Sequence, residues 1–354
     1  MQHARLHSIN RIFLASSKRD QTPASLREID GAEQKNSIRQ RQMSSLPHIN
    51  VWAQWLSDHS LAVTLVLALF ALLSEAAGRT VSTQMRTSQS TTRQWASTWL
   101  TNIALLACAI AVSLSLGPWL SPWFSDALSG KSGLLVWLGF DRGASVAHVV
   151  VGIFLLDLIA YALHRVMHFV PLLWRLHQVH HSDTVMNAST HFRQHPLAMI
   201  ATIAMQVPLL WLMGIPAISW VLYLVLASAV ELWHHSAMRL PVSLDRWLGI
   251  VVVTPQFHRT HHNQARKFHD ANYSSVFPLW DRLFGTAALA PLNAPLGLTR
   301  WKPTQNAGVI SVDACLLMPL RPLIAPIAQS LTRPVGKPTV RDNQKLHTNN
   351  RGNT

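Results

Sequence analysis

The sequence is poor in charged residues. Asp, Glu, Lys and Arg make up only 13% of its 354 residues, whereas a soluble domain carries roughly 25%. Hydrophobic residues make up 49%, and many of them gather in long runs. This composition argues against an ordinary soluble globular protein and predicts a membrane protein.

Cysteine is also scarce. Cys108 lies inside an apolar run and Cys315 lies far from it, so we expect neither a disulfide framework nor a Cys-x-x-Cys site. The formal net charge of +14 arises partly from residues 1–42, which contribute eight basic and four acidic side chains. No basic stripe interleaved with aromatic residues appears in a compact domain, so we expect no nucleic-acid partner. The basic loops and tail of a membrane protein account for the charge.

Four apolar runs are about as long as a helix that crosses roughly 30 Å of hydrocarbon. They are Leu100 to Gly117, Ala144 to Leu163, Pro196 to Met213 and Pro216 to Trp233. The last two flank Gly214-Ile215-Pro216, which predicts a helical hairpin. An earlier run, Leu61 to Leu73, is short. Either it crosses the membrane with the help of its flanking residues, or it is a buried or interfacial helix. The sequence thus predicts an all-α, polytopic membrane protein with about four to five apolar helices.

Histidine is concentrated in the middle of the chain. Of 19 histidines, 13 lie between His164 and His269, and many of them form three clusters just outside the apolar runs. The clusters are His164-x-x-x-His168, His177-x-x-His180-His181 and His258-x-x-His261-His262. On a helix, positions i, i+3 and i+4 share one face, so each cluster can direct its rings at one point.

Imidazole nitrogen suits iron, zinc, copper or nickel better than magnesium or calcium. Eight rings are too many for one ion, so the clusters predict two ions. Pro171 separates the first two clusters, which we therefore expect on different helices. Because a hairpin returns the chain to the side it left, all three clusters should face the same side and form a helical, histidine-lined di-metal cap.

The positive-inside rule predicts that this side is cytoplasmic. The loop between the short run and the first long run carries Arg79, Arg86 and Arg93 with no acid, whereas the loop between the first two long runs balances its basic residues with acids. If all the runs cross the membrane, the basic N-terminal extension lies outside, which disagrees with the positive-inside rule. A start at Met43 would remove that conflict.

We predict three regions. Residues 1–50 are a polar, disordered extension, residues 51–286 form the membrane-embedded domain, and residues 287–354 are a C-terminal extension that is disordered from about residue 333.

Longer motifs around the clusters resemble those of the sterol desaturase and fatty acid hydroxylase superfamily. They are Asp157-x-x-x-Tyr161-x-x-His164-Arg165-x-x-His168, Leu173-Trp174-Arg175-x-His177-x-x-His180-His181-Ser182, Arg193-x-His195-Pro196, His258-Arg259-x-His261-His262, and Asn272-Tyr273 before Trp280-Asp281-Arg282-Leu283-Phe284-Gly285-Thr286. The resemblance covers roughly residues 55 to 286 and is specific in order, spacing and flanking residues.

The resemblance implies an integral membrane, non-haem di-iron enzyme that uses molecular oxygen and electrons to hydroxylate or desaturate a lipid. It also implies that His195 and His235 are ligands. The expected metal ligands are then His164, His168, His177, His180, His181, His195, His235, His258, His261 and His262. Zinc competes with ferrous iron for nitrogen sites, so the isolated protein could carry zinc.

Four positions depart from the family pattern. His191 stands where a small or aliphatic residue is expected, Ala198 where an acid is common, Ala237 where Asn is common, and Ser274 where Gly usually follows Asn-Tyr. These departures lie outside the three main clusters, so they concern the surroundings of the metal site and the substrate.

Three acids are candidates for orienting the ligand rings: Asp157, Asp183 and Glu231. A metal-bound imidazole usually donates its second N–H to a carboxylate or carbonyl, and an acid inside an apolar run is costly and often functional. A helix-helix hydrogen bond is the equal alternative for Asp157 and Glu231. His234 and His269 stay unassigned.

The sequence leaves the lipid and the choice between hydroxylation and desaturation open. It contains no cytochrome-like or ferredoxin-like segment, so we expect electrons from a separate protein, ferredoxin-like or a b-type cytochrome with its reductase. Two other classes compete with the enzyme. One is a membrane protein that binds or transports metal, and the other is an inactive family member that binds lipid.

Topology can be tested by cysteine labelling. In a protein without Cys108 and Cys315, we introduce single cysteines near Lys131, near Asp183 and near Gln264 and apply an impermeant thiol reagent to sealed cells. We expect only the cysteine near Lys131 to react, because the histidine clusters face the cytoplasm. Labelling near Asp183 or Gln264 from outside would contradict the orientation.

Overall fold

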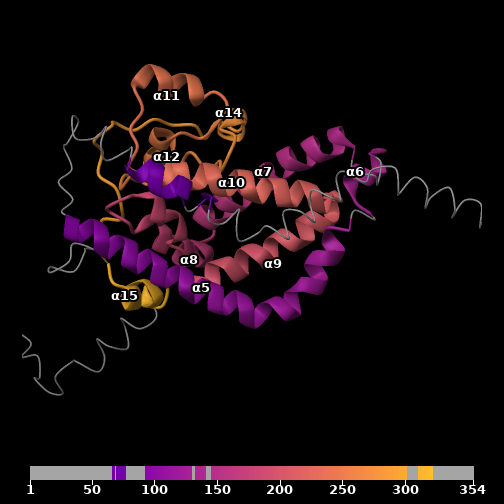
Figure 1. Cartoon of the computed structure of the whole chain (residues 1–354), viewed down its shortest axis with the longest axis horizontal. Helices are drawn as coiled ribbons and strands as arrows, with labels where there is room; N and C mark the ends of the chain where they lie inside the picture. The colour runs from indigo at the N-terminus through magenta and orange to yellow at the C-terminus, as the bar shows by residue number, and fades with distance from the viewer. Residues whose placement is uncertain are drawn as a thin grey trace, which may run out of the picture.

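The computed structural model describes residues 66–67, 69–76, 92–129, 132–140, 145–300 and 310–321. Within these ranges the regular structure is helical (Figure 1). The helices α5 (Thr92–Ala127), α7 (Val146–Phe169), α9 (Pro196–Met213) and α10 (Ala217–His235) are the four in the described part that are long and apolar enough to cross a membrane. The all-α, polytopic fold predicted from the sequence is confirmed.

Two of these helices, α5 and α7, extend by more than one turn beyond the predicted runs. The first run, predicted from Leu100 to Gly117, is the middle of the 36-residue α5, which contains Pro118 and Pro122. Figure 1 shows that α5 is bent. A proline inside a helix removes one backbone hydrogen bond and commonly causes such a bend. The second run continues as α7 to Phe169, so His164 and His168 lie on the same helix as the apolar run.

The short helices gather at one end of these four. They are α8 (Pro171–His181), the 3-10 helix η2 (Ala188–Phe192), α11 (Val242–Leu248), α12 (Pro255–His261), α13 (Arg266–His269) and α14 (Leu279–Leu283). The opposite end carries α6 (Leu134–Trp137), and there the loop before α6 meets the turn between α9 and α10. A Cβ placed on Gly214 would lie 2.6 Å from the Ser132 carbonyl oxygen, and Gly214 itself has a left-handed φ of 68°. The hairpin therefore returns the chain to the end with the short helices, as predicted. We call this end, which carries the histidine clusters, the histidine end.

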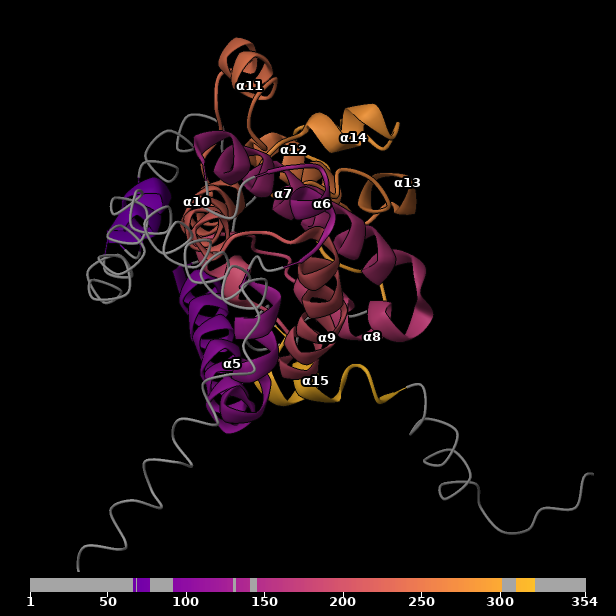
Figure 2. The same ribbon diagram turned by 90° about the vertical axis from the view of Figure 1, so that its right-hand side faces the viewer.

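The core lies between α7, α9 and α10. Leu156 and Leu163 of α7 pack with Leu210 of α9 and with Tyr223 and Val230 of α10. Figure 2 shows the same arrangement from the side of α6, with α5 beside α9.

The outward faces stay apolar. Leu114 is 74% exposed and Trp119 is 77% exposed, as expected for side chains that contact lipid.

Two further segments pack on this frame. Helical residues 69–76 belong to the short run Leu61 to Leu73, whose earlier part lies outside the described residues. Glu75 is buried there, and its carboxylate accepts hydrogen bonds from the Trp95 indole and from the backbone N–H groups of Ala188 and Ala237. Helix α15 (Val312–Leu317) contacts α5 and lies in the segment predicted as a C-terminal extension. The predicted extension over residues 1–50 and the disorder expected from about residue 333 fall outside the described residues.

Helices α7 and α10 approach closely at Gly152. A Cβ on Gly152 would lie 2.5 Å from Ser219 Oγ, which donates a hydrogen bond to the Val149 carbonyl. Small residues allow this kind of close approach between membrane helices.

We expect Gly152→Leu to destabilise the protein in detergent by about 1–3 kcal/mol, because the larger side chain must force α7 and α10 apart. The measurement is the thermal unfolding midpoint. Gly117→Leu is the matched control, since nothing lies within 4 Å of a Cβ there. Equal midpoints for the two variants would contradict this account of the packing.

Candidate metal centre

The sequence around Pro171 brings the first two histidine clusters together. Helix α7 ends at Phe169 and α8 begins at Pro171, which occupies the first turn, where a proline needs no N–H partner. The chain reverses at this junction, so α8 packs against α7. The prediction that these clusters lie on separate helices is confirmed.

The third cluster lies on α12. Thr254 caps this helix by accepting a hydrogen bond from the Phe257 N–H, and Pro255 follows in the first turn. His258 and His261 lie on α12, and His262 is its C-cap. Helix α12 contacts α10, which ends at His235.

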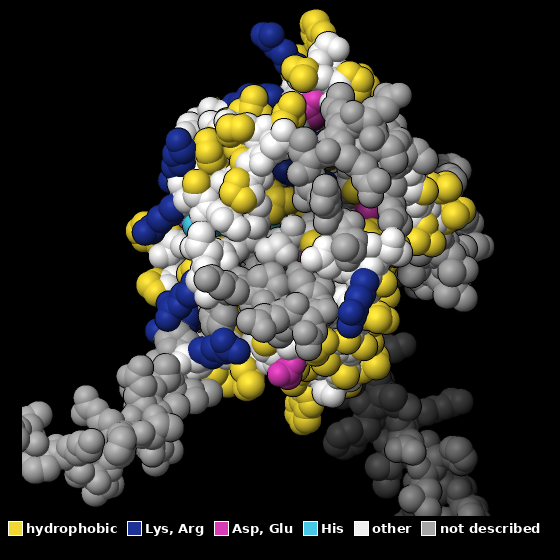
Figure 3. Space-filling view, turned by 90° about the vertical axis from the view of Figure 1, so that its left-hand side faces the viewer, with side chains coloured by type: hydrophobic (Ala, Val, Ile, Leu, Met, Phe, Trp, Pro, Cys, Tyr) yellow, Lys and Arg dark blue, Asp and Glu magenta, His cyan; other side chains and the backbone are white. Residues whose placement is uncertain are grey.

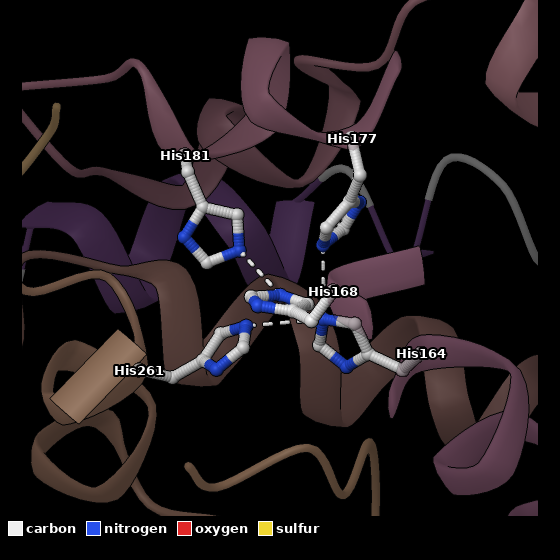
Figure 4. Close-up of side chains that lie close together, drawn as sticks. All are labelled: His164, His168, His177, His181 and His261. Carbon is white, nitrogen blue, oxygen red and sulfur yellow. Dashed lines mark hydrogen bonds between the residues drawn. The ribbon is translucent and has the colours of Figure 1, made fainter. Parts of the chain in front are cut away.

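Nine histidines form two adjacent groups. The first group, drawn in Figure 4, contains His164, His168, His177, His181 and His261. The second contains His180, His235, His258 and His262. Within each group the candidate ligand nitrogens all lie within 4.8 Å of one another. The groups touch, since the ring centroids of His181 and His262 are 4.7 Å apart.

The ring nitrogens approach one another at ligand spacing. In the first group, His164 Nε2 lies 3.0 Å from both His177 Nε2 and His261 Nε2. In the second, His235 Nε2 lies 2.9 Å from His258 Nε2 and 3.2 Å from His180 Nε2. Two nitrogens bound about 2.1 Å from one ion, at angles of about 90° to 110°, lie about 3.0 to 3.4 Å apart.

The tautomers of three rings show what these short distances require. His164 Nδ1 donates to the Tyr273 carbonyl at 2.8 Å, and His261 Nδ1 donates to the Ala271 carbonyl at 2.6 Å. A carbonyl only accepts, so in both neutral rings Nε2 carries a lone pair and no proton. The two Nε2 atoms that face each other at 3.0 Å therefore repel, unless a cation lies between them. The tautomer of His235 is fixed in the same way, because its Nδ1 donates to the Glu231 carbonyl at 2.7 Å.

Burial keeps these rings neutral. Removal from water lowers the pKa of His177, His181, His258, His261 and His262 well below the usual value, and neighbouring histidines lower it further. Protonation is therefore not available to relieve the contacts between lone pairs. Neutral imidazoles with fixed tautomers are the form that binds a transition metal, so the donor set fits two such ions.

A turn at Asn272 supplies two of the carbonyls. Asn272 has a left-handed φ of 57°, which Asn tolerates better than most residues. Its side chain donates to the carbonyls of Phe257 and Ala288 and accepts from the Ala288 N–H. Asn272 lies between Ala271 and Tyr273, so this turn is what presents both carbonyls to the rings.

Carboxylates hold the segment after that turn. Asp281 accepts from the N–H groups of Tyr273 and Ser274. Asp157, on α7, accepts from the N–H groups of Val276 and Phe277, as well as from the side chains of Tyr223 and Trp280. Both acids therefore position the turn that presents the carbonyls to the rings.

The other acids have different partners. Asp183 binds the side chains of Asn102 and Thr190, and the Glu231 carboxylate pairs with His191 Nδ1 at 3.1 Å. Among the described hydrogen bonds, none joins the carboxylate of Asp157, Asp183 or Glu231 to a ring of the two groups. The predicted role of these side chains as direct partners of the rings is not what the structure shows. Asp270 makes a contact of this kind, with Oδ1 3.4 Å from His168 Nδ1.

His195 lies apart from both groups. Its Nδ1 accepts a hydrogen bond from the Leu197 N–H at the start of α9, and its Nε2 donates to the Leu316 carbonyl of α15. Both ring nitrogens are thus occupied by backbone groups. The ligand role that the resemblance implied for His195 does not match this position, and the other nine expected ligands are together.

The remaining histidines of the region lie beside the two groups. His234 stacks on His258 with ring centroids 3.8 Å apart, and His269 stacks on Trp174 at 5.5 Å. Neither belongs to a group of candidate ligands.

Two arginines of the motifs, Arg193 and Arg282, bind mainly backbone and neutral groups. Arg193 is fully buried and reaches the Val179 carbonyl, Asn102 and Ser182. Arg282 donates to the carbonyls of Gly249 and Ile250. They hold the histidine end together.

A cavity of about 410 Å³ borders both histidine groups. His164 and His177 of the first group and His180, His235 and His258 of the second line it. The cavity also extends along apolar side chains of α7 and α9, including Leu163 and Met199. Its size is typical of a small-molecule site.

Comparison with known proteins agrees with this geometry. The family model described as fatty acid hydroxylase matches residues 149–286, which contain all nine grouped histidines. The match covers less than half of the chain. Over this segment, the predicted resemblance to the sterol desaturase and fatty acid hydroxylase superfamily is confirmed.

Several curated relatives are similar to part of this chain. Human alkylglycerol monooxygenase is 32% identical over 139 residues, which is 39% of this chain and 30% of that enzyme. The ornithine lipid hydroxylase of Rhizobium tropici is 28% identical, over 41% of this chain and 43% of the relative. Human lathosterol oxidase is 28% identical, over 46% of this chain and 54% of the relative. The chain therefore covers between about a third and a half of these relatives. No solved structure matches it.

The two roles of histidine can be separated by mutation. We expect the purified protein to hold about two metal ions per chain, and His261→Ala to lower that number by about one, because a ring of the first group is lost. His195→Ala should keep both ions while lowering the thermal midpoint, because it removes a helix cap. Elemental analysis with thermal unfolding is the measurement. If His195→Ala loses metal, His195 is a ligand after all and this assignment is wrong.

Proposed function

We propose that the protein hydroxylates a lipid, using molecular oxygen and a di-iron centre held by the two histidine groups. The observation that carries the proposal is that one cavity is bordered by rings of both groups. A lipid chain in this cavity would lie beside the residues that would hold both ions. The relatives, whose names are alkylglycerol monooxygenase, ornithine lipid hydroxylase and lathosterol oxidase, support an oxidation of a lipid.

The chemistry needs the metal. An unactivated C–H bond resists acids, bases and nucleophiles, so the redox chemistry must come from a cofactor. Iron supplies the transfer of electrons to oxygen that this reaction requires. In the overall balance one oxygen atom enters the C–H bond and the other leaves as water, with two electrons and two protons taken up. Zinc binds nitrogen ligands more tightly than ferrous iron and can replace it in a purified sample.

The residues of the chain perform the supporting tasks. Nine imidazoles would hold the ions, and the carbonyls of Ala271, Tyr273 and Glu231 keep three of these rings in the ligating tautomer. Burial of the rings keeps them neutral and limits the access of bulk water. The apolar wall of the cavity, with Leu163 and Met199, suits the hydrocarbon part of a lipid.

The electrons would come from a separate cytoplasmic protein, either ferredoxin-like or a b-type cytochrome with its reductase. Figure 3 shows several Lys and Arg side chains and few Asp or Glu side chains among the described residues on this face, which supports a cytoplasmic orientation of the end that carries the histidine groups. Basic side chains are enriched on the cytoplasmic side of membrane proteins. A basic face also suits an acidic electron donor.

Metal transport is a weaker account of the same residues. A transporter needs its ligands along a path near the middle of the bilayer. The grouped histidines instead lie where α7 and α10 end and on the short helices beyond them. They form two groups beside a cavity, and seven of the nine residues are buried.

The test compares lipids from cells that produce the wild-type protein or His180→Ala. We expect one lipid class to gain an oxygen atom in wild-type cells, and this product to be absent with the variant, because His180 belongs to the second group and lines the cavity. Mass spectrometry of total lipid extracts measures it. His347→Ala, outside the matched domain, is the control and should retain activity. An oxygenated product that His180→Ala still forms would contradict the proposal.

A further inference from the structure

Helix α11 exposes its apolar side chains. No residue of this helix is buried, although four of its seven residues are Val, Leu or Trp. Trp247 is 72% exposed, and Ile250 and Val251, which follow the helix, are 52% and 66% exposed. Packing within the described part of the chain therefore does not account for the apolar character of this segment.

Helix α14 continues this exposed surface. Its Leu283 is 65% exposed, and Phe284, which is its C-cap, is 48% exposed. Arg282 links the two helices, because its guanidinium donates to the carbonyls of Gly249 and Ile250 at the end of α11. We call the exposed apolar side chains of these two segments the α11–α14 patch, which includes Leu244, Trp247, Ile250, Val251, Leu283 and Phe284.

The patch lies beside the membrane-spanning helices. In Figure 1, α11 and α14 stand to one side of α10, near the end of that helix that carries His235. Figure 2 looks along the long helices and also shows α11 and α14 outside the group formed by α5, α7, α9 and α10. A segment that projects sideways from such a group faces the bilayer around it and not only the water beyond its end.

Two ring stacks place α14 beside the apolar part of a membrane-spanning helix. Phe277, just before α14, stacks on Phe154 of α7 with ring centroids 4.8 Å apart, and Phe284 stacks on Tyr161 of α7 at 5.4 Å. Phe154 and Tyr161 both precede His164 on α7. The exposed apolar surface of α14 is therefore continuous with the surface that α7 presents to lipid.

We propose that the α11–α14 patch inserts into the bilayer surface on the side of the histidine groups. The inference goes beyond the proposed reaction and does not depend on it. Interfacial segments of this kind are buried about 5–10 Å into the boundary between headgroups and acyl chains, where Trp is enriched. Arg246 and Arg282 are exposed in the same two helices, and arginines extend their charged ends from such segments to the headgroups.

The patch is tied to the candidate metal centre. Asp281 belongs to α14 and accepts from the N–H groups of Tyr273 and Ser274. The Tyr273 carbonyl in turn accepts from His164 Nδ1. Insertion of α14 therefore sets how far this turn lies from the bilayer surface. The four long helices hold the chain in the membrane, and the patch holds the histidine end against it.

The experiment measures contact between the patch and lipid in the full-length protein, reconstituted into phosphatidylcholine vesicles. In a protein without Cys108 and Cys315, Trp247→Cys is labelled with an environment-sensitive fluorophore. The vesicles contain phosphatidylcholine with a nitroxide quencher either near the headgroup or near the end of an acyl chain. We expect strong quenching, larger with the nitroxide near the headgroup, because the insertion is shallow.

Two control positions bracket this result. Leu114→Cys, on the exposed apolar face of α5, should be quenched more by the nitroxide near the end of the acyl chain. Lys267→Cys, at an exposed position of α13, should be quenched about threefold less than Trp247→Cys, because it lies in water. Quenching at residue 247 no larger than at residue 267 would overturn the proposal. A blue-shifted emission without quenching would indicate a protein partner, such as a second copy of the chain, and would overturn it as well.

A double variant tests the side chains of the patch. With the fluorophore at Val251→Cys, we expect Leu244→Ser with Leu283→Ser to lower the quenching by about half or more, because less apolar surface inserts. The thermal midpoint in detergent should stay near that of wild type, since both side chains are exposed. Ser243→Ala, at an exposed position of α11, is the matched control and should keep the quenching. Unchanged quenching in the double variant would overturn the assignment of the patch.

These outcomes are separable from those of the proposed reaction. The quenching is measured without substrate, oxygen or an electron donor, so it reports on the patch alone. A protein that inserts the patch and oxidises no lipid would contradict the hydroxylation and support the insertion.

Discussion

The interaction on which this structure depends is the hydrogen bond from a buried imidazole Nδ1 to a backbone carbonyl. At His164, His235 and His261 it fixes the proton on Nδ1, which leaves the Nε2 lone pair directed at other rings about 3 Å away. Burial lowers the pKa of His261, so protonation does not remove the repulsion. The arrangement is unfavourable by itself and favourable around a cation, which is why nine neutral rings in one place indicate a metal centre.

The rest of the histidine end can be understood as support for those carbonyls. Asn272 makes the turn that exposes two of them, Asp281 holds the residues that follow, and Asp157 ties the next part of the same segment to α7. A carboxylate in an apolar helix is costly. Here two backbone N–H groups and two side chains offset that cost, so Asp157 links the membrane-spanning helices to the metal centre without touching a ligand ring.

The cavity is lined by two kinds of side chain. Histidines of both groups form part of its lining, and His191 and Ser274, which depart from the family pattern, form another part. His191 and Ser274 belong to neither group of candidate ligands. A change at these two positions therefore need not remove a candidate metal ligand.

The sequence by itself determined the all-α fold, the four long apolar helices and the eight clustered histidines that come together in the structure, because hydrophobic length and helical spacing are local properties. Only the tertiary structure decided how the histidines divide into two groups, since His180 and His181 are neighbours in sequence and belong to different groups. It also placed His195 apart from both groups, as the N-cap of α9. It showed, too, that backbone carbonyls orient three of the grouped rings. Every residue has a carbonyl, so which one meets a ring depends on how distant segments pack.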